Sequence, residues 1–285
     1  MATTKATDLA AGQIAMVGAA RFTYEHNSIC PQVFTRMTLD PGEKSVYIPK
    51  FGGVSAKDLT DGVDMTESQS LTITGTTHTT DEAGCKVIIT RKLRHQLKAD
   101  AYAAAGRVIG NAMWKKMDED GLGLFSGLDT TVGAAGTAFS IDYMQVAVTQ
   151  CYAQAEPVPM PMVCVLHANQ LHEVVDLLAT PGTNNVPDVI QSNALKQYWR
   201  GNDKLYGCPI FSTGRISVDT SDDAYGAVFS KEAFIYLVGW EPDNWVEEDK
   251  SLRGWEIGIV ADYGMVEEDG GYGRALLFDA STPTS

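Results

Sequence analysis

The stretch LKADAYAAAGRVIGNAMWKKMDEDGLGL, from Leu97 to Leu124, predicts one long helix. It is rich in strong helix formers and contains no proline. Apolar residues at helical spacing predict two adjacent buried stripes, one of Tyr102, Ala105, Ile109, Met113 and Met117 and one of Leu97, Ala101, Ala105, Val108 and Ala112. A helix of this length needs an extended partner beside it. Gly121 and Gly123 are expected to end it.

Charged residues flank this helix at both ends. The segment before it is the most basic in the chain and includes Arg91, Lys92 and Arg94. These residues, with basic side chains along the helix, either contact phosphate or pair with acidic neighbours, and pairing is the favoured interpretation. The far end carries Asp118, Glu119 and Asp120, whose negative charge is unfavourable at a helix C-terminus. Either a cation from elsewhere in the chain pairs with them, or that end is solvated.

Upstream of the helix, the sequence predicts a long β-hairpin. Ser45 to Pro49 alternates like a half-buried strand, and Ser70 to Thr74 is the expected partner. Between them, Lys50 to Gln69 is rich in glycine, serine and aspartate. A connection this long without an element of its own is uncommon inside a domain, so we expect the tip to reach another molecule; a solvated surface loop is the alternative.

Downstream of the helix, strands and helices alternate. Ile141 to Gln154 and Asn169 to Leu178 are expected helices on either side of a buried strand, Met162 to Leu166. This order indicates an α/β lobe. The remainder reads as β structure, with expected strands at Leu205–Ser212, Ala227–Phe229, Phe234–Val238, Trp255–Ala261 and Ala275–Phe278.

Composition limits the possible functions. The 285 residues are 44% hydrophobic, which is ample for a core, and the formal charge of -14 argues against a general grip on nucleic acid. Five cysteines without a CxxC pair indicate neither a disulfide framework nor a zinc knuckle, and favour a reducing cytoplasm. The sequence shows no signal-peptide core and no apolar run long enough to span a membrane.

No catalytic motif is visible. The best enzyme candidate is the segment HANQLHE, which carries His167, His172 and Glu173, but its spacing fits no zinc motif. Asp118 to Gly121 does not fit a calcium loop in any frame. The sequence therefore predicts neither an enzyme nor a cofactor or metal site.

The order of the expected parts resembles the major capsid protein of tailed double-stranded-DNA bacteriophages, the Hong Kong 97-type capsid fold. Four phrases are similar to that family: ITRKLRHQ before the long helix, MDEDGLGLFSGL at its end, YGCPIFSTGRI, and YGAVFSKEAFIYLV. The resemblance covers nearly the whole chain. It implies an α+β fold with an N-terminal arm, an extended hairpin loop, a peripheral domain with a spine helix and a β-sheet, and an α/β axial domain.

The resemblance also implies domain boundaries: an arm at 1–38, the hairpin loop at 39–84, the peripheral domain at 85–139, the axial domain at 140–223, and a β-rich return at 224–285. Copies of the chain would form the hexamers and pentamers of an icosahedral head around double-stranded DNA, without sequence-specific binding. The chain would be assembled in the host cytoplasm and reside in the virion. Because the arm begins within the first forty residues, a separate scaffolding protein is implied, with a portal and optional decoration proteins as further partners.

Two sets of residues are expected to contact neighbouring subunits. The hairpin set is Tyr47, Ile48, Lys50, Phe51, Val54 and Lys57, and the spine-helix set is Arg91, Lys92, Arg94, Asp118, Glu119 and Asp120. Some members of the family cross-link a hairpin lysine to an asparagine, and no motif here identifies that asparagine. Two alternatives stay open: an encapsulin-like shell that encloses a cargo enzyme, and a soluble metal-dependent α/β enzyme that uses His167, His172 and Glu173.

Overall fold

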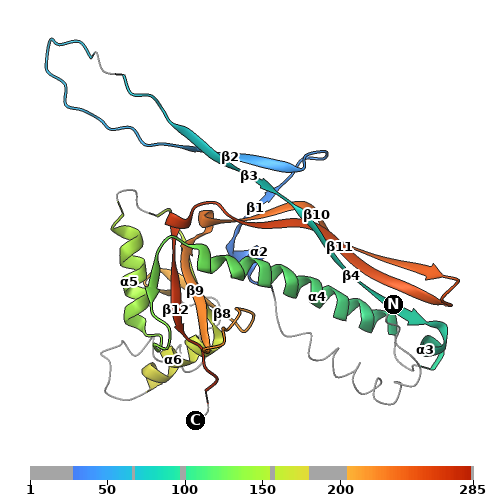
Figure 1. The fold of residues 1–285 in the computed structure, drawn as a ribbon. Helices are drawn as coiled ribbons and strands as arrows, with labels where there is room; N and C mark the ends of the chain where they lie inside the picture. Colours follow the sequence, from blue (N-terminus) through green and yellow to red (C-terminus); the bar gives the residue numbers. More distant parts are fainter. Residues whose placement is uncertain (1–27, 66–67, 97–100, 155–157, 180–203, 284–285) are drawn as a thin grey trace.

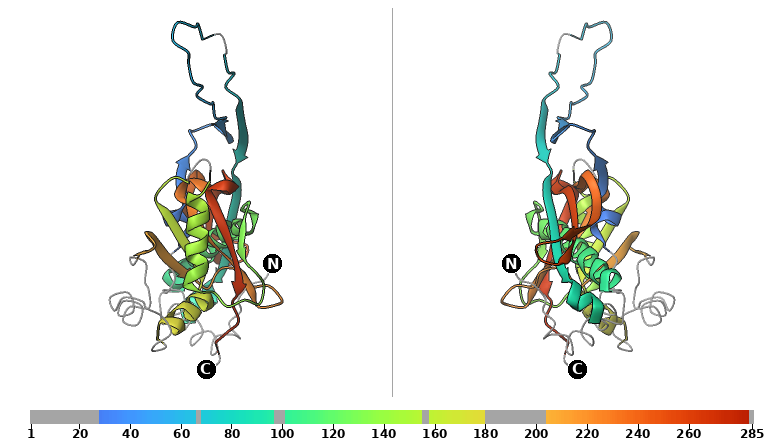
Figure 2. Two further views of the ribbon diagram at one scale, coloured as in Figure 1. Left: turned by 90° about the vertical axis from the view of Figure 1, so that its left-hand side faces the viewer. Right: turned by 90° about the vertical axis from the view of Figure 1, so that its right-hand side faces the viewer.

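A computed structural model describes residues 28–65, 68–96, 101–154, 158–179 and 204–283 (Figure 1). A long helix and a twisted sheet form an elongated peripheral part. A second sheet with two helices forms an axial part at one end, and a hairpin projects beyond the body (Figures 1 and 2). The arrangement is the α+β fold that the sequence predicts.

The long helix is α4, Ala101–Gly123, preceded by α3, Arg91–Gln96, and followed by a 3-10 turn, η2, Leu124–Gly127. The first predicted stripe is confirmed where side chains are described, because Ala105, Ile109, Met113 and Met117 are all buried. The second stripe is wrong: Val108 and Ala112 are exposed. The helix therefore buries one narrow face and leaves the other in solvent.

The peripheral sheet lies along α4 (Figure 1). Its strand order is β1-β10-β11-β4, with bounds Thr35–Thr38, Phe234–Asp249, Gly254–Glu267 and Asp81–Thr90. Alternate residues of β11, including Ile257, Ile259 and Tyr263, join the buried face of α4 in one core. This sheet is the extended partner that the length of α4 requires.

The axial sheet has six strands in the order β5-β12-β9-β6-β8-β7. Their bounds are Thr131–Gly133, Gly273–Asp279, Asp223–Ser230, Met162–His167, Cys208–Thr213 and Lys204–Leu205. Helices α5, Ile141–Tyr152, and α6, Ala168–Ala179, pack in one core with Cys164 and Leu166 of β6. Val163 and Val165 instead belong to the core shared with the peripheral sheet, so β6 is buried on both faces. That double burial explains its uninterrupted apolar sequence.

Four phenylalanines join the two parts. Phe34 follows the short helix α2, Cys30–Val33, and stacks on Phe234 of β10 with ring centroids 5.0 Å apart. Phe125 of η2 and Phe229 of β9 complete the cluster, 5.4 Å from each other. Residues from the arm, the end of the spine helix and both sheets thus share one aromatic core, which fixes the two sheets relative to each other.

The projecting hairpin consists of β2, Ser45–Phe51, and β3, Ile73–Thr79. Its register pairs Ser45 with Thr79 and Phe51 with Ile73. The second strand therefore begins at Ile73, three residues later than the alternating pattern from Ser70 predicts.

The sheets also cross the expected domain limits. β1 comes from the arm, β5 joins the axial sheet, and β4 pairs with β11 from Asp81 onward. None of the described helices is long and apolar enough to cross a membrane.

Candidate inter-subunit surface

The two faces of the hairpin have different environments. In β2, exposed and half-buried residues alternate from Ser45 to Phe51. Tyr47 and Phe51 point outward and are 55% and 62% exposed, and Ile73, the cross-strand partner of Phe51, is exposed beside it. This outward face is an apolar surface that the subunit itself does not cover.

The opposite face packs on the body of the subunit. Val46 and Ile48 contact a small core formed by Leu39, Ile235 and Leu237. Ile48 is half-buried against its own subunit. This finding corrects the expectation that a neighbouring copy covers Ile48. The strict alternation of a strand explains the result, because residues 47 and 48 must face opposite sides.

Charged contacts anchor the base of the hairpin as well. Lys50 Nζ lies 3.2 Å from Asp269 Oδ2 and also donates to the backbone oxygen of Glu268. His78 of β3 is buried, and its Nε2 lies 3.0 Å from Glu268 Oε2. Lys50 therefore holds the hairpin to its own subunit instead of lying free for a neighbour.

Beyond the strands, the described residues 52–65 and 68–72 form an open tip. Gly52 N–H donates to the oxygen of Thr72 at 2.7 Å, and the side chain of Gln69 bonds both the N–H and the oxygen of Ser55. The apolar side chains of the tip are all exposed: Val54, Leu59, Val63, Met65 and Leu71. Lys57 lies among them. So many exposed apolar residues on one projection are typical of a protein interface.

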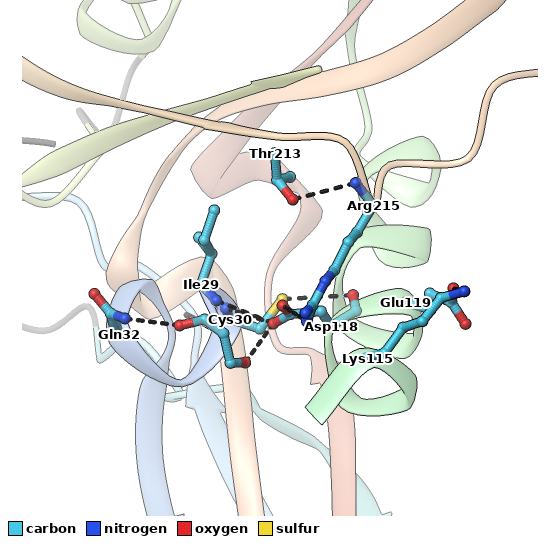
Figure 3. Close-up of polar contacts among 9 residues, drawn as sticks. Ile29, Cys30, Gln32, Lys115, Asp118, Glu119, Thr213 and Arg215 are labelled. Atoms are coloured by element: carbon cyan, nitrogen blue, oxygen red, sulfur yellow. Dashed lines mark hydrogen bonds and ion pairs between the residues drawn. The ribbon is translucent and has the colours of Figure 1, made fainter. Parts of the chain in front are cut away.

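Asp118 lies inside the subunit (Figure 3). It is 1% exposed, and its Oδ2 accepts a bond from Arg215 Nη1 at 2.6 Å. Its Oδ1 accepts bonds from the hydroxyl of Ser28 and from the N–H groups of Ile29 and Cys30, the last two at 3.1 and 3.2 Å. The cation from elsewhere that the helix end required is therefore Arg215. Asp118 is therefore not available as a contact for a neighbouring subunit.

The other two acidic residues of the spine set, Glu119 and Asp120, remain accessible at the surface. Glu119 pairs with Lys115 at 3.4 Å, and Asp120 pairs with Lys116 and accepts a bond of 2.7 Å from the hydroxyl of Tyr263. That bond and burial raise the pKa of Tyr263 above its usual value, burial being the larger cause.

At the start of the helix region, Arg91 pairs with Glu248 and lies over the ring of Trp255 at 5.5 Å. Pairing with acidic neighbours, the favoured interpretation, is thus confirmed for Arg91. Lys92 is exposed, and the side chain of Arg94 lies outside the described residues.

The enzyme candidate gains no support from the geometry. His167 is buried, its Nδ1 accepts a bond from the N–H of Asn169 at 3.2 Å, and burial lowers its pKa. This is the role of a local cap at the start of α6. Among the residues that the structure describes, no three His, Cys, Asp or Glu side chains are grouped to hold a metal ion.

Solved structures from several phages have the same fold as this chain. No family model and no curated protein matches the sequence. A solved chain of Mycobacterium phage Che8 superposes with a TM-score of 0.70 at 15% identity, covering 88% of this chain and 91% of that one. The capsid of Ralstonia phage GP4 gives 0.68 at 14% identity over 89% and 88%, and that of cyanophage P-SCSP1u gives 0.65 at 14% over 90% of each. The chain has the Hong Kong 97-type capsid fold.

Several residues that build this capsid fold were missed by sequence reasoning. Arg215 and Ser28, the partners of Asp118, are distant from it in the chain, and no local pattern marks them. Glu268 and Asp269, which anchor the hairpin, stand in an acidic loop that resembles any solvated turn. A usable signal was available only at Asp118, because a carboxylate in the last turn of a helix calls for a cation.

Proposed function

We propose that this chain is a major capsid protein whose copies assemble into the hexamers and pentamers of an icosahedral phage head around double-stranded DNA. The hairpin of each copy lies over the neighbouring copy in the shell. The role is structural and not enzymatic.

The observation that carries the proposal is the hairpin itself. Its base is fixed to the body by Ile48 and Lys50, while the tip leaves five large apolar side chains in solvent. A single subunit gains nothing from such a projection, because exposed apolar area is unfavourable in water. Burial under or over another copy recovers that free energy, and repetition of the contact builds a shell.

The charge of the chain fits the enclosed genome. A net charge of -14 gives the packaged DNA no general attraction to the wall, so the DNA can enter and leave. We place the protein in the virion after assembly in the host cytoplasm, with a scaffolding protein, a portal and optional decoration proteins as its partners.

Negative-stain microscopy of the purified chain tests the proposal, with closed shells, capsomers or tubes as the expected result. A uniform small oligomer with stoichiometric bound metal, lost in His172→Ala, would support the enzyme alternative instead. The contents of shells formed in the native host distinguish a phage head from an encapsulin-like compartment. Nuclease-protected DNA supports a phage head, and a protein cargo without DNA supports an encapsulin-like compartment.

The hairpin has its own test. Residues 52–72 are replaced by Asn-Gly, because Phe51 and Ile73 are directly paired and a two-residue turn can join them. The expected product is a folded subunit that does not close shells. A matched variant keeps the full length but changes the five exposed apolar residues of the tip to serine, and it should fail in the same way. Normal shells from either variant would refute the role given to the hairpin.

A further inference from the structure

The base of the hairpin lies beside a group of four carboxylates of the body: Asp129, Glu267, Glu268 and Asp269. The hairpin contributes two basic side chains to this group, Lys50 from β2 and His78 from β3. All the acidic residues of this group belong to the body, and both basic residues belong to the hairpin. The charge of the body carboxylates therefore acts on the attachment of the hairpin.

The carboxyl group of Glu267, the last residue of β11, packs closely against backbone. A Cβ at Gly270 would lie 2.6 Å from Glu267 Oε1, and a Cβ at Gly127 would lie 2.6 Å from Glu267 Oε2. The Cβ position of Gly270 is also 2.8 Å from Asp129 Oδ1, so the two carboxyl groups meet at this glycine. A side chain on either glycine would displace Glu267, so its position beside Asp129 is built into the fold.

Two opposing influences act on the charge of Glu267. Burial first, and then the neighbouring Asp129 and Asp269, raise its pKa above the usual value, whereas the positive charge of Lys50 lowers it. Lys50 therefore favours the ionised form of Glu267. By linkage, Lys50 is itself held more tightly when Glu267 is ionised than when it is protonated.

Lys50 transmits this charge to the hairpin. Its Nζ lies 3.2 Å from Asp269 Oδ2 and also donates to the backbone oxygen of Glu268. We propose that Glu267 is a pH-sensitive switch at the hairpin base: its ionised form attracts Lys50 and holds β2 to the body, and its protonation loosens that hold. The switch belongs to the single subunit and goes beyond the proposed function. Under that function, it makes the position of the hairpin during assembly depend on pH.

His78 is the titratable group that the hairpin itself brings to this site. Its Nε2 lies 3.0 Å from Glu268 Oε2. Histidine side chains gain a proton as the pH falls from about 8 to 5, and a charged His78 would be attracted more strongly to Glu268. This effect would tighten the hairpin base at lower pH, whereas protonation of Glu267 loosens it. The direction of the pH response therefore distinguishes the two groups.

Arg274 of β12 approaches the same loop from the axial side. Its guanidinium donates to the backbone oxygens of Gly271, Gly273 and Gln150. Arg274 therefore binds the backbone of the turn before β12 and the end of α5, and Lys50 is the cation that acts on Glu267.

Hydrogen exchange of the unassembled subunit, kept dilute, tests the switch. The protection of the β2 amides is corrected for the intrinsic exchange rate at each pH and compared with that of β12. In the wild type it should fall by about two- to five-fold from pH 8 to pH 5, the range expected for a partly exposed charge interaction. Asp269 stays charged over this range, because the ordinary pKa of aspartate is about 3.9. Glu267→Gln should show the lower protection at pH 8 already, without a further fall.

A double-mutant cycle assigns the effect to Lys50 and Glu267. Lys50→Met should lower the urea midpoint of unfolding more at pH 8 than at pH 5, because only the ionised Glu267 attracts Lys50. In the Glu267→Gln background, the same change should lower the midpoint equally at both pH values. Lys44→Met, at the exposed lysine just before β2, is the matched control and should change the midpoint little at either pH.

Two results would overturn the switch. One is β2 protection that rises toward pH 5, or that falls equally in the wild type and in Glu267→Gln. The other is an effect of Lys50→Met with the same pH dependence in both backgrounds. All these measurements use the unassembled subunit, so a chain that never forms capsomers or shells would refute the proposed function and leave the switch standing. The two failures are therefore distinct.

Discussion

Asp118 and Arg215, separated by 97 residues in the chain, form a buried ion pair with 2.6 Å between Oδ2 and Nη1. The pair joins the spine helix to the loop that follows β8 of the axial sheet (Figure 3). Because Asp118 also binds the N–H groups at the start of α2, one carboxylate connects the arm, the spine helix and the axial part.

Removal of this carboxylate should destabilise the subunit before it affects assembly. Asp118→Ala removes the carboxylate that the largely buried Arg215 guanidinium and the N–H groups of Ile29 and Cys30 bind, and loss of one member of such a pair costs about 3–5 kcal/mol. Urea unfolding of the unassembled subunit measures the change. Glu119→Ala, one residue along the helix and exposed, is the matched control and should change the free energy of unfolding by less than about 0.5 kcal/mol. Equal effects of the two changes would contradict the role of Asp118.

Two glycines of the same helix should respond in opposite directions to alanine. A Cβ at Gly121 would lie 2.6 Å from Cys30 Sγ and 3.0 Å from the ring of Phe34, so Gly121→Ala should push α2 away and cost about 1–3 kcal/mol. Gly110 has no heavy atom within 4 Å of that position, so Gly110→Ala should stabilise by up to about 1 kcal/mol through helix propensity. Thermal unfolding of both variants measures the contrast. Stabilisation by Gly121→Ala would show that α2 is not held closely.

Features that depend on neighbouring residues in the chain could be predicted from the sequence, and features that depend on contacts between distant residues could not. The spine helix was predictable because helix formers and spacing act within a few turns. The role of Gly121 was not predictable. A glycine at this position predicts a helix end, whereas in the structure its missing side chain leaves room for Cys30, which is distant in the chain. The alternation in β2 predicted a strand, but which face is covered depends on Ile235 and Leu237, which no local pattern links to it.

A carboxyl group beside the hairpin anchor should make stability depend on pH. Burial first, and then the neighbouring Asp129 and Asp269, raise the pKa of Glu267 above its usual value. Folding therefore favours the protonated form, and this contribution is lost as the pH rises through the folded-state pKa. Glu267→Gln should unfold at higher urea than the wild type at pH 7, and the difference should shrink as the pH falls toward about 4, the ordinary pKa of glutamate. A difference that is constant with pH would contradict this assignment.

Two neighbouring positions of β2 should separate folding from assembly. Phe51 is 62% exposed on the outward face, so Phe51→Ser should leave the free energy of unfolding within about 0.5 kcal/mol of the wild type. The same change removes apolar area that a neighbouring copy is proposed to cover, so assembly followed by light scattering should slow or stop.

Ile48→Ser is the matched control on the opposite face of the same strand. Ile48 packs on the core of Leu39, Ile235 and Leu237, so the change should cost the subunit about 1 kcal/mol, less than for a fully buried isoleucine. The change weakens the packing of the hairpin base on its own subunit, so assembly should decrease only to the extent that this packing is lost. A lower temperature that restores the packing should therefore restore assembly. Phe51→Ser should not recover in this way, since its subunit is already folded. If both variants assembled and unfolded alike, the two faces of β2 would not have the separate roles that their environments indicate.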